Sequence, residues 1–238
     1  MNITKKQSYS EQSGFTIIEL LIATAVLSVI LVMVSAMMIG ISHLYYKGIT
    51  QSSVQDNART VTDQIAQDIK LAGASLISSS VAPGDDQSYC MGTTRYSFVL
   101  GRQLSDNPTI YQSYHVLWRD SVTAGTCPSM PASTLNSSGL QSSDPSGTEL
   151  IGQNSMLTEF SITSVGTVGS VFTVSIGEAE GNPVLLCDSG TPGDCNSINN
   201  SVNVWDPNAA TGKVICKGLT GSQLCATDYL TTTVSERI

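Results

Sequence analysis

One long apolar stretch near the amino terminus constrains the fold of this 238-residue chain more than any other feature. After Glu19, the next Asp, Glu, Lys or Arg is Lys47, so residues 20–46 contain none of these four types. At about 1.5 Å per residue, a helix of roughly 20 residues already crosses a hydrocarbon core of about 30 Å. The stretch therefore predicts a single helix that can span a membrane.

A short polar leader, residues 1–14, precedes the apolar stretch and ends in glycine. An ordinary secretory signal has its cleavage site after its apolar region. Here the junction between Gly14 and Phe15 lies before that region, which indicates a different kind of processing. Small-residue pairs inside the stretch leave an ordinary signal peptidase site as the alternative, namely Ala23 with Ala25 and Val34 with Ala36.

Glu19 argues against a plain membrane anchor. A carboxylate near the bilayer centre costs roughly 2.5 to 3.5 kcal/mol on insertion scales, and an anchor has no use for that cost. Counted from a new terminus at Phe15, Glu19 is the fifth residue, about one helical turn from a free α-amine. We therefore predict that its carboxylate pairs with such an amine on a neighbouring subunit.

The sequence GFTIIELLIATAVL resembles the class III signal of type IV pilins and type II secretion pseudopilins. The resemblance implies that a prepilin peptidase cleaves after Gly14 and methylates the new terminus at Phe15. It also implies that Glu19 acts in assembly and that the helix enters a filament core. From the residues alone, a single-pass anchor or uncleaved signal with an incidental glutamate remains the alternative.

The helical pattern continues beyond the apolar stretch as an amphipathic segment. Apolar residues recur there at spacings of three and four, between charged residues, and Gly73 suits a helix end. A helix from Phe15 to Ala72 would be about 87 Å long. Gly40 and Gly48 each weaken a helix interior by about 1 kcal/mol, so fraying or bending is expected between them. The apolar stripe comprises Val54, Ala58, Val61, Ile65, Ile69 and Ala72.

The segment QDNARTVTDQIAQDIKLAGA resembles minor pilins of the PilW type and their J-type secretion counterparts. Lys70 stands where arginine is commoner in that group. Ala36 stands where many major pilins carry a proline, which puts the site of helix melting in a filament in doubt. The matching residues are Asn57, Ala58, Arg59, Asp68, Ile69, Lys70, Ala72 and Gly73.

These resemblances together imply a minor pilin that primes or caps type IV pilus assembly, with a minor pseudopilin of a type II secretion system as the alternative. The implied partners are other major and minor pilins, the prepilin peptidase, the inner-membrane assembly platform and the membrane itself. Lys5 and Lys6 favour a cytoplasmic leader. We therefore expect a single-pass bacterial inner-membrane protein with a periplasmic head, which later joins a pilus or pseudopilus.

Residues 74–238 change to a composition rich in Ser, Gly and Thr, with short β-type runs. One antiparallel sheet covered by the amphipathic half of the helix is the expected head, so the predicted fold class is α+β and pilin-like. The domains are a leader (1–14), a filament-core helix (15–40), its amphipathic continuation (41–73) and the head. Expected strands are Tyr96–Leu100, Thr109–Arg119, Leu157–Val165, Val171–Ile176 and Tyr229–Val234, with a hairpin loop at Gly166–Ser170 and loops at 120–147 and 187–225.

All six cysteines follow the apolar stretch, which favours disulfides in an oxidising periplasm. Six cysteines allow 15 connectivities, and no CxxC pair supports zinc. Acidic loops leave calcium as an alternative to solvated carboxylates, although no cofactor is expected. The spacings favour Cys187 with Cys195 and Cys216 with Cys225, which leaves Cys90 for Cys127. The acids concerned are Asp85, Asp86, Asp188 and Asp194.

Motifs of catalysis are absent from the sequence, including GxSxG, HExxH and the nucleotide-binding glycine loops. His43 and His115 are the two available histidine bases, and we expect His115 to lie on a strand surface. The net charge of −8 argues against nucleic-acid binding. We therefore expect no enzyme, with a membrane-anchored adhesin or binding domain as a further alternative. Packing is the expected role of the aromatic residues Tyr111, Tyr114, Trp118 and Trp205.

Overall fold

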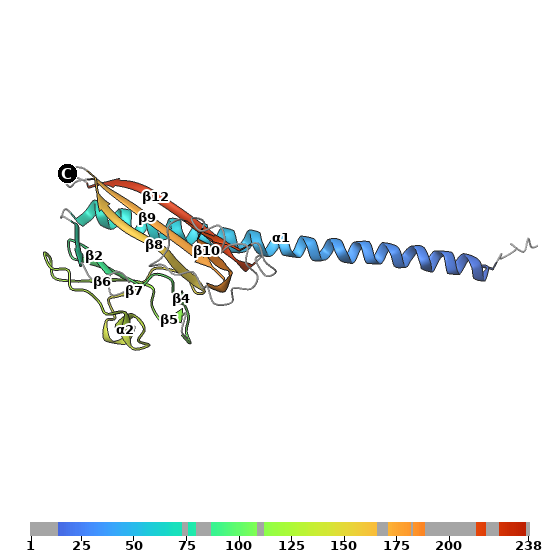
Figure 1. Ribbon diagram of the computed structural model, residues 1–238, viewed down its shortest axis with the longest axis horizontal. Coiled ribbons are helices and arrows are strands. Elements are labelled where there is room, and N and C mark those ends of the chain that lie inside the picture. Colours follow the sequence, from blue (N-terminus) through green and yellow to red (C-terminus); the bar gives the residue numbers. More distant parts are fainter. Residues whose placement is uncertain are drawn as a thin grey trace, which may run out of the picture. The chain divides into compact units, whose positions relative to one another are not determined.

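The computed structural model describes residues 14–72, 76–79, 87–108, 112–165, 171–181, 183–188, 213–217 and 224–236. The chain forms two compact units, Met1–Leu44 and Tyr45–Ile238, and we call the second unit the head. Helix α1, Ile17–Ala72, is continuous through the boundary between them (Figure 1). The expected single long helix is therefore confirmed.

The first half of α1 has an apolar and exposed surface. Every residue from Gly14 to Ile49 is exposed. Of the helices in the described ranges, α1 is the one that is long and apolar enough to cross a membrane. The helix is unbroken at Gly40 and Gly48, so the fraying expected there is not found. Because exposed apolar surface of this extent is unfavourable in water, lipid or other helices must cover it.

The head contains two five-stranded sheets instead of the one that was expected. The first sheet is antiparallel throughout, with strand order β1-β2-β3-β6-β7, and the second has the order β12-β9-β8-β4-β5 with one parallel pair, β4 and β5. The first sheet comprises β1 (Leu76–Ser79), β2 (Gln87–Met91), β3 (Thr94–Phe98), β6 (Leu117–Ser121) and β7 (Thr148–Glu149). The second comprises β4 (Gln103–Leu104), β5 (Gln112–Ser113), β8 (Ser155–Ser164), β9 (Val171–Glu180) and β12 (Ala226–Ser235).

Smaller elements complete the described part of the head. Strands β10 (Leu186–Asp188) and β11 (Val214–Cys216) form a separate antiparallel pair. The predicted loop at 120–147 contains two short helices, α2 (Ala132–Leu135) and α3 (Leu140–Ser143), and a 3-10 turn, η1, spans Pro183–Leu185. The two short helices are held because Leu135 and Leu140 pack with Trp118 and Met130 in a small cluster of their own.

The long antiparallel strands were predicted well, and one expected strand was wrong. Strands β8, β9 and β12 pair side by side along their lengths, as Figure 1 shows, and the predicted hairpin loop at 166–170 lies outside the described residues. The expected strand Thr109–Arg119 is instead β5 in the second sheet and β6 in the first, with a bend at Tyr114 between them. Residues 109–111 lie outside the described ranges.

The predicted stripe of α1 forms the centre of the core. Its members from Val54 to Ile69 are at most 1% exposed, and Ala72 is partly buried. Fully burying an aliphatic side chain stabilises a fold by about 1.5 to 3 kcal/mol, so these positions fix the helix on both sheets. Phe98 and Phe160 link the two sheets, with ring centroids 4.9 Å apart. The strands contribute Tyr96, Phe98 and Leu117 from the first sheet, and Phe160, Ile162, Phe172, Val174 and Ile176 from the second.

Candidate functional site

The predicted processing site lies at the start of the described chain. Gly14 and Phe15 precede helix α1 and are exposed, with Phe15 at 87%. A side chain placed at Gly14 would meet no atom within 4 Å. The described residues therefore leave the Gly14–Phe15 junction open to an enzyme, and residues 1–13 of the leader lie outside them.

Glu19 begins the helix by capping it. Its Oε2 accepts hydrogen bonds from the backbone N–H of Thr16 at 2.9 Å and from the Thr16 hydroxyl at 2.8 Å. In return, the Glu19 N–H donates to Thr16 Oγ1 at 3.3 Å. This reciprocal arrangement is a capping box, which satisfies donors that a helix start otherwise leaves free. A carboxylate in the first turn is also favoured by the helix dipole.

The capping role corrects part of the sequence reasoning about Glu19. The acid lies at one end of the apolar stretch, in the first turn of α1, so the insertion cost of a carboxylate at the bilayer centre does not apply in full. The Thr-x-x-Glu spacing of Thr16 and Glu19 was the signal that could have revealed this role. The pairing of Glu19 with an amine of a neighbouring subunit stays a prediction.

An ion-pair network anchors α1 to the first sheet. Asp68 accepts two hydrogen bonds from Arg119, at 2.7 Å from Nε and 2.9 Å from Nη2, and a third from the Tyr96 hydroxyl. Burial, together with the nearby Asp68 carboxylate, raises the pKa of Tyr96, so the phenol stays protonated and donates. From the sequence, Asp68 was a charge flanking the stripe and a part of the minor-pilin resemblance. Its anchoring role was not predicted, because its partners are more than twenty residues away in the chain.

Disulfides fix loops of the head in the expected pattern. Cys90 is bonded to Cys127, and Cys216 to Cys225. Cys187 is also disulfide-bonded, and its predicted partner, Cys195, lies outside the described residues. Cys216–Cys225 is a pairing that the sequence spacing favoured, Cys90–Cys127 is the pairing that it left, and no described cysteine is free.

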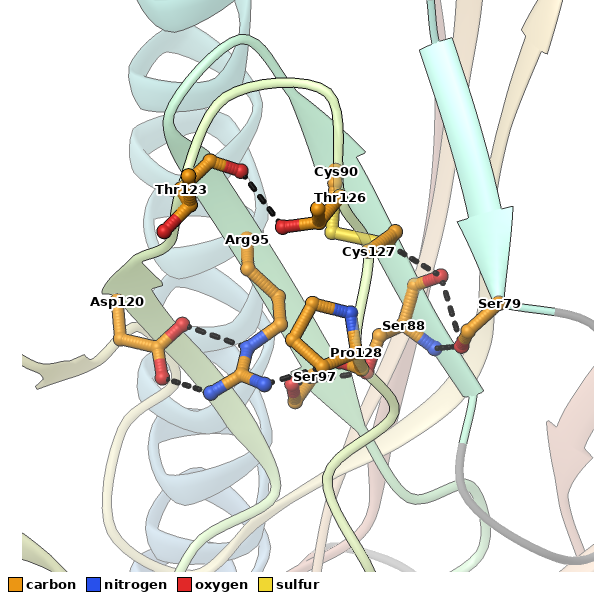
Figure 2. Close-up of a disulfide and its surroundings, with 10 residues drawn as sticks. All are labelled: Ser79, Ser88, Cys90, Arg95, Ser97, Asp120, Thr123, Thr126, Cys127 and Pro128. Carbon is orange, nitrogen blue, oxygen red and sulfur yellow. Dashed lines mark hydrogen bonds and ion pairs between the residues drawn. A yellow bond between two sulfur atoms is a disulfide. The ribbon is translucent and has the colours of Figure 1, made fainter.

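The Cys90–Cys127 disulfide is reinforced by an arginine on β3. Figure 2 shows Arg95 between Asp120 and Pro128, next to this disulfide. Its guanidinium donates to Asp120 Oδ1 at 2.9 Å from Nε, to Asp120 Oδ2 from Nη2, and to the Pro128 carbonyl at 2.9 Å from Nη1. Burial raises the pKa of Asp120, and the contact with Arg95 opposes that rise. The disulfide and the arginine together hold the segment after β6 against the first sheet.

The histidine candidates take structural positions. His115 is 8% exposed, so its predicted place on a strand surface was wrong. Its ring packs edge-on against Trp118 at 4.5 Å, and its Nδ1 lies 3.5 Å from Glu149 Oε2. Next to His115, at the start of β6, Glu149 accepts the backbone N–H groups of Val116 and Leu117, at 2.9 Å each. His43 is exposed on α1.

The structure describes some of the aromatic and acidic candidates, and the others lie outside the described residues. Trp118 is fully buried, in agreement with a packing role, whereas Tyr114 is partly exposed. Asp188 is buried at the end of β10. In the described ranges, no three or more His, Cys, Asp or Glu side chains are arranged to hold a metal ion. The calcium alternative stays untested, since several of the candidates lie outside the described residues, namely Asp85, Asp86 and Asp194, as do Tyr111 and Trp205.

Comparison with known proteins identifies the amino-terminal segment. Residues 9–35 match the family model of the prokaryotic N-terminal methylation motif. The matched segment includes Gly14, Phe15 and Glu19, and the match indicates a type IV pilin-like prepilin. No curated protein and no solved structure matches the chain.

Proposed function

We propose that this protein is a minor pilin that primes or caps the assembly of a type IV pilus. Its amino-terminal helix enters the filament core, and its head lies at the filament surface. The observation that carries the proposal is the methylation motif at residues 9–35, placed at the front of an exposed apolar helix. A protein of this kind is a structural subunit, which is usually not an enzyme.

The exposed half of α1 supports this role on physical grounds. Its apolar side chains are covered by lipid while the subunit waits in the bacterial inner membrane, and by other helices once it joins the filament. Transfer between these two apolar environments does not expose the helix to water. The driving force for assembly therefore depends on specific contacts, and the Glu19 carboxylate with the amine of a neighbouring Phe15 supplies one.

The head supports the remaining parts of the proposal. Disulfides such as Cys90–Cys127 suit a periplasmic and later extracellular head. The loops and small elements added to its two sheets suit a low-copy subunit. The partners are major and minor pilins, the prepilin peptidase that cleaves at Gly14, and the inner-membrane assembly platform.

A second candidate is a minor pseudopilin of a type II secretion system. The segment around Asp68 favours it equally, because PilW-type and J-type subunits share the resemblance there, and Asp68 is the residue that anchors α1 to the head. The two candidates differ in the machinery that accompanies the subunit, so the identity of the co-purifying assembly system separates them.

Isolation of the processed protein from its own bacterium tests the proposal. We expect a mature chain that begins with methylated Phe15 and that co-purifies with other Gly-Phe-type subunits and a pilus assembly ATPase. Co-purification with a secretion ATPase instead would favour the pseudopilin. A chain that begins after Ala25 or Ala36, or that keeps residues 1–14 and has no such partners, would refute both candidates and favour a membrane-anchored binding domain.

A further inference from the structure

A fully buried acid lies where α1 first contacts the strands of the head. Glu178 on β9 is 0% exposed. Its Oε1 accepts a hydrogen bond from Asn57 Nδ2 on α1 at 2.8 Å. One helical turn and a half before Asn57, Gln51 Nε2 donates to the carbonyl of Thr227 on β12 at 3.3 Å. Polar contacts at both ends therefore hold the segment Gln51–Asn57 of α1 against the strands. Between them, Val54 contributes a buried apolar side chain.

Two further acids lie on the same face of the second sheet as Glu178. Asp228 is directly opposite Glu178 in the register of β9 and β12. Glu180 lies two residues along β9 and so points to the same side. The Oε2 atoms of Glu178 and Glu180 are both buried, with Ser155 beside the first carboxyl group and Ser53 beside the second. Three carboxyl groups thus lie close together on one face of the sheet, and Glu178 is the fully buried one among them.

An ionised Glu178 is unfavourable in this region for two reasons. Burial removes water from the carboxylate, and Glu180 and Asp228 add like charge. Burial first, and then these two acids, raise the pKa of Glu178 from 4.5 to about 7, against the opposing contacts of Asn57 and Ser155. Burial likewise raises the pKa of Glu180, opposed by Ser53 on α1. Binding a proton at Glu178 removes its charge.

Asn57 is the link between Glu178 and the helix. Its amide fills the space beside Gly152, where an added Cβ would come within 2.6 Å of Asn57 Nδ2. When Glu178 ionises, the hydrogen bond from Asn57 opposes the cost of burying the charge and the repulsion from Glu180 and Asp228, but does not cancel them. The contact between the helix segment and the strands is therefore weaker when Glu178 is ionised.

We propose that Glu178, Glu180 and Asp228 form a proton-operated latch, which holds the α1 segment Gln51–Asn57 on β9 and β12 when Glu178 is protonated and loosens it when Glu178 is ionised. This inference concerns the head alone and stands whether or not the protein assembles into a pilus. Under this proposal, the pH of the surrounding medium determines how firmly the segment Gln51–Asn57 is held on β9 and β12.

The direction of the pH effect follows from the two protonation states. In the docked state Glu178 keeps its proton up to about pH 7, whereas in an opened state it loses the proton near pH 4.5. Docking is therefore fully favoured below pH 4.5, is weakened as the pH rises to 7, and changes little above that. The latch is closed in acid and loosened in mild alkali.

Hydrogen exchange of the full chain in detergent micelles measures the latch directly. Peptides that cover residues 50–60 are compared at pH 5.5 and pH 8.5, with labelling times scaled to equal intrinsic exchange. We expect protection of this segment to fall roughly thirtyfold at the higher pH, while peptides from Ile65 to Ile69 keep theirs. Protection that is equal at both pH values would overturn the latch.

Matched variants separate the buried acid from other charges. Glu178→Gln keeps the shape without the charge, so its protection should be equal at pH 5.5 and pH 8.5. Asp56→Asn removes an exposed acid from the same segment and should retain the wild-type response. Glu180→Gln and Asp228→Asn should move the transition to lower pH, and they keep the test decisive if Glu178→Gln does not fold. A pH response that persists in Glu178→Gln, or unchanged midpoints in the other two, would refute the proposal.

A cation is the competing occupant of this acidic region. Addition of calcium to the wild-type protein at pH 8.5 should leave the loosened segment unprotected if the latch takes only a proton. Recovery of the pH 5.5 level of protection with calcium would overturn the latch and would indicate a cation site in its place.

Discussion

At the scale of single residues, Glu19 combines two tasks that variants can separate. Its carboxylate caps α1 together with Thr16, and under the proposed function it also supplies the charge that pairs with a neighbouring amine. Glutamine serves at the same position of a capping box as glutamate. Glu19→Gln therefore removes the charge and keeps the cap, whereas Thr16→Ala weakens the cap and keeps the charge.

We predict that Glu19→Gln and Glu19→Ala both abolish incorporation into filaments, whereas Thr16→Ala retains it. The loss of a cap typically destabilises a helix by about 1 kcal/mol, which membrane insertion of α1 offsets. Incorporation is measured by immunoblotting of sheared filaments against whole cells. Normal incorporation of Glu19→Gln would show that assembly does not require the charge.

Asp68 provides a second test at this scale. Asp68→Ala leaves the partly buried Arg119 guanidinium and the buried Tyr96 hydroxyl without their shared acceptor, so we expect the head to lose about 2 to 3 kcal/mol of unfolding free energy. Asp63→Ala, an exposed acid on the same helix, should change it by less than about 0.5 kcal/mol. Denaturant unfolding followed by tryptophan fluorescence makes the comparison, and equal losses would contradict the anchoring role of Asp68.

At the scale of elements, the periodicity of apolar residues predicted the helix face and the strands whose burial depends on residues nearby in the sequence. The apolar stripe from Val54 to Ile69 follows from a spacing of three to four residues. The long strands β8, β9 and β12 follow from alternation with a period of two residues. The expected strand Thr109–Arg119 was wrong because Glu149, more than thirty residues later, takes the N–H groups that a longer strand would have used. Strand β2, QSYCM, carries too few β-branched residues to be recognised.

The candidate sites show the same division. Gly14, Phe15 and Glu19 lie within six consecutive residues, so a motif could identify them. The capping box of Thr16 and Glu19 could have been predicted from their spacing alone. The acids at Glu178 and Asp228 are fifty residues apart and meet only through the register of β9 and β12. No sequence pattern reports that register in advance, because several alignments of these two strands would bury an apolar face equally well.

The disulfides allow a prediction at the element scale. Cys90 and Cys127 are 37 residues apart, and Cys216 and Cys225 are 9 apart. In the chain-entropy model these closures stabilise the head by about 4 and about 2.6 kcal/mol. Replacing both cysteines of the first pair with serine should therefore lower the unfolding free energy more than replacing both of the second. Denaturant titration tests the order, and the reverse order would mean that strain or unfolded-state structure outweighs loop entropy.

At the scale of the whole molecule, the two units depend on different surroundings. The head covers the apolar stripe of α1 with its own sheets, but the exposed residues from Phe15 to Leu44 have no such cover in the described chain. They require either lipid or other helices. Under the proposed function, processing at Gly14 changes neither requirement, because residues 1–14 lie before the apolar stretch.

Cleavage of the leader and extraction of α1 from the membrane should therefore be separable steps. In cells without the assembly ATPase, we predict that the protein is cleaved to begin at Phe15 but stays entirely in the membrane fraction. Gly14→Leu should remain in the membrane with its leader attached, whether or not the ATPase is present. The open space around Gly14 means that the larger side chain does not disturb the described chain, so a block in cleavage would reflect recognition by the peptidase.

Amino-terminal sequencing of fractionated cells distinguishes these outcomes. Mature protein in the soluble periplasm without the ATPase would mean that the apolar half of α1 finds cover other than lipid or a filament. Normal cleavage of Gly14→Leu would mean that the peptidase does not read this glycine, which removes the processing step from the proposed function. If wild-type protein appears in sheared filaments only when the ATPase is restored, the result supports extraction by the assembly machinery. Leaving the bilayer is the step for which α1 needs a new apolar partner.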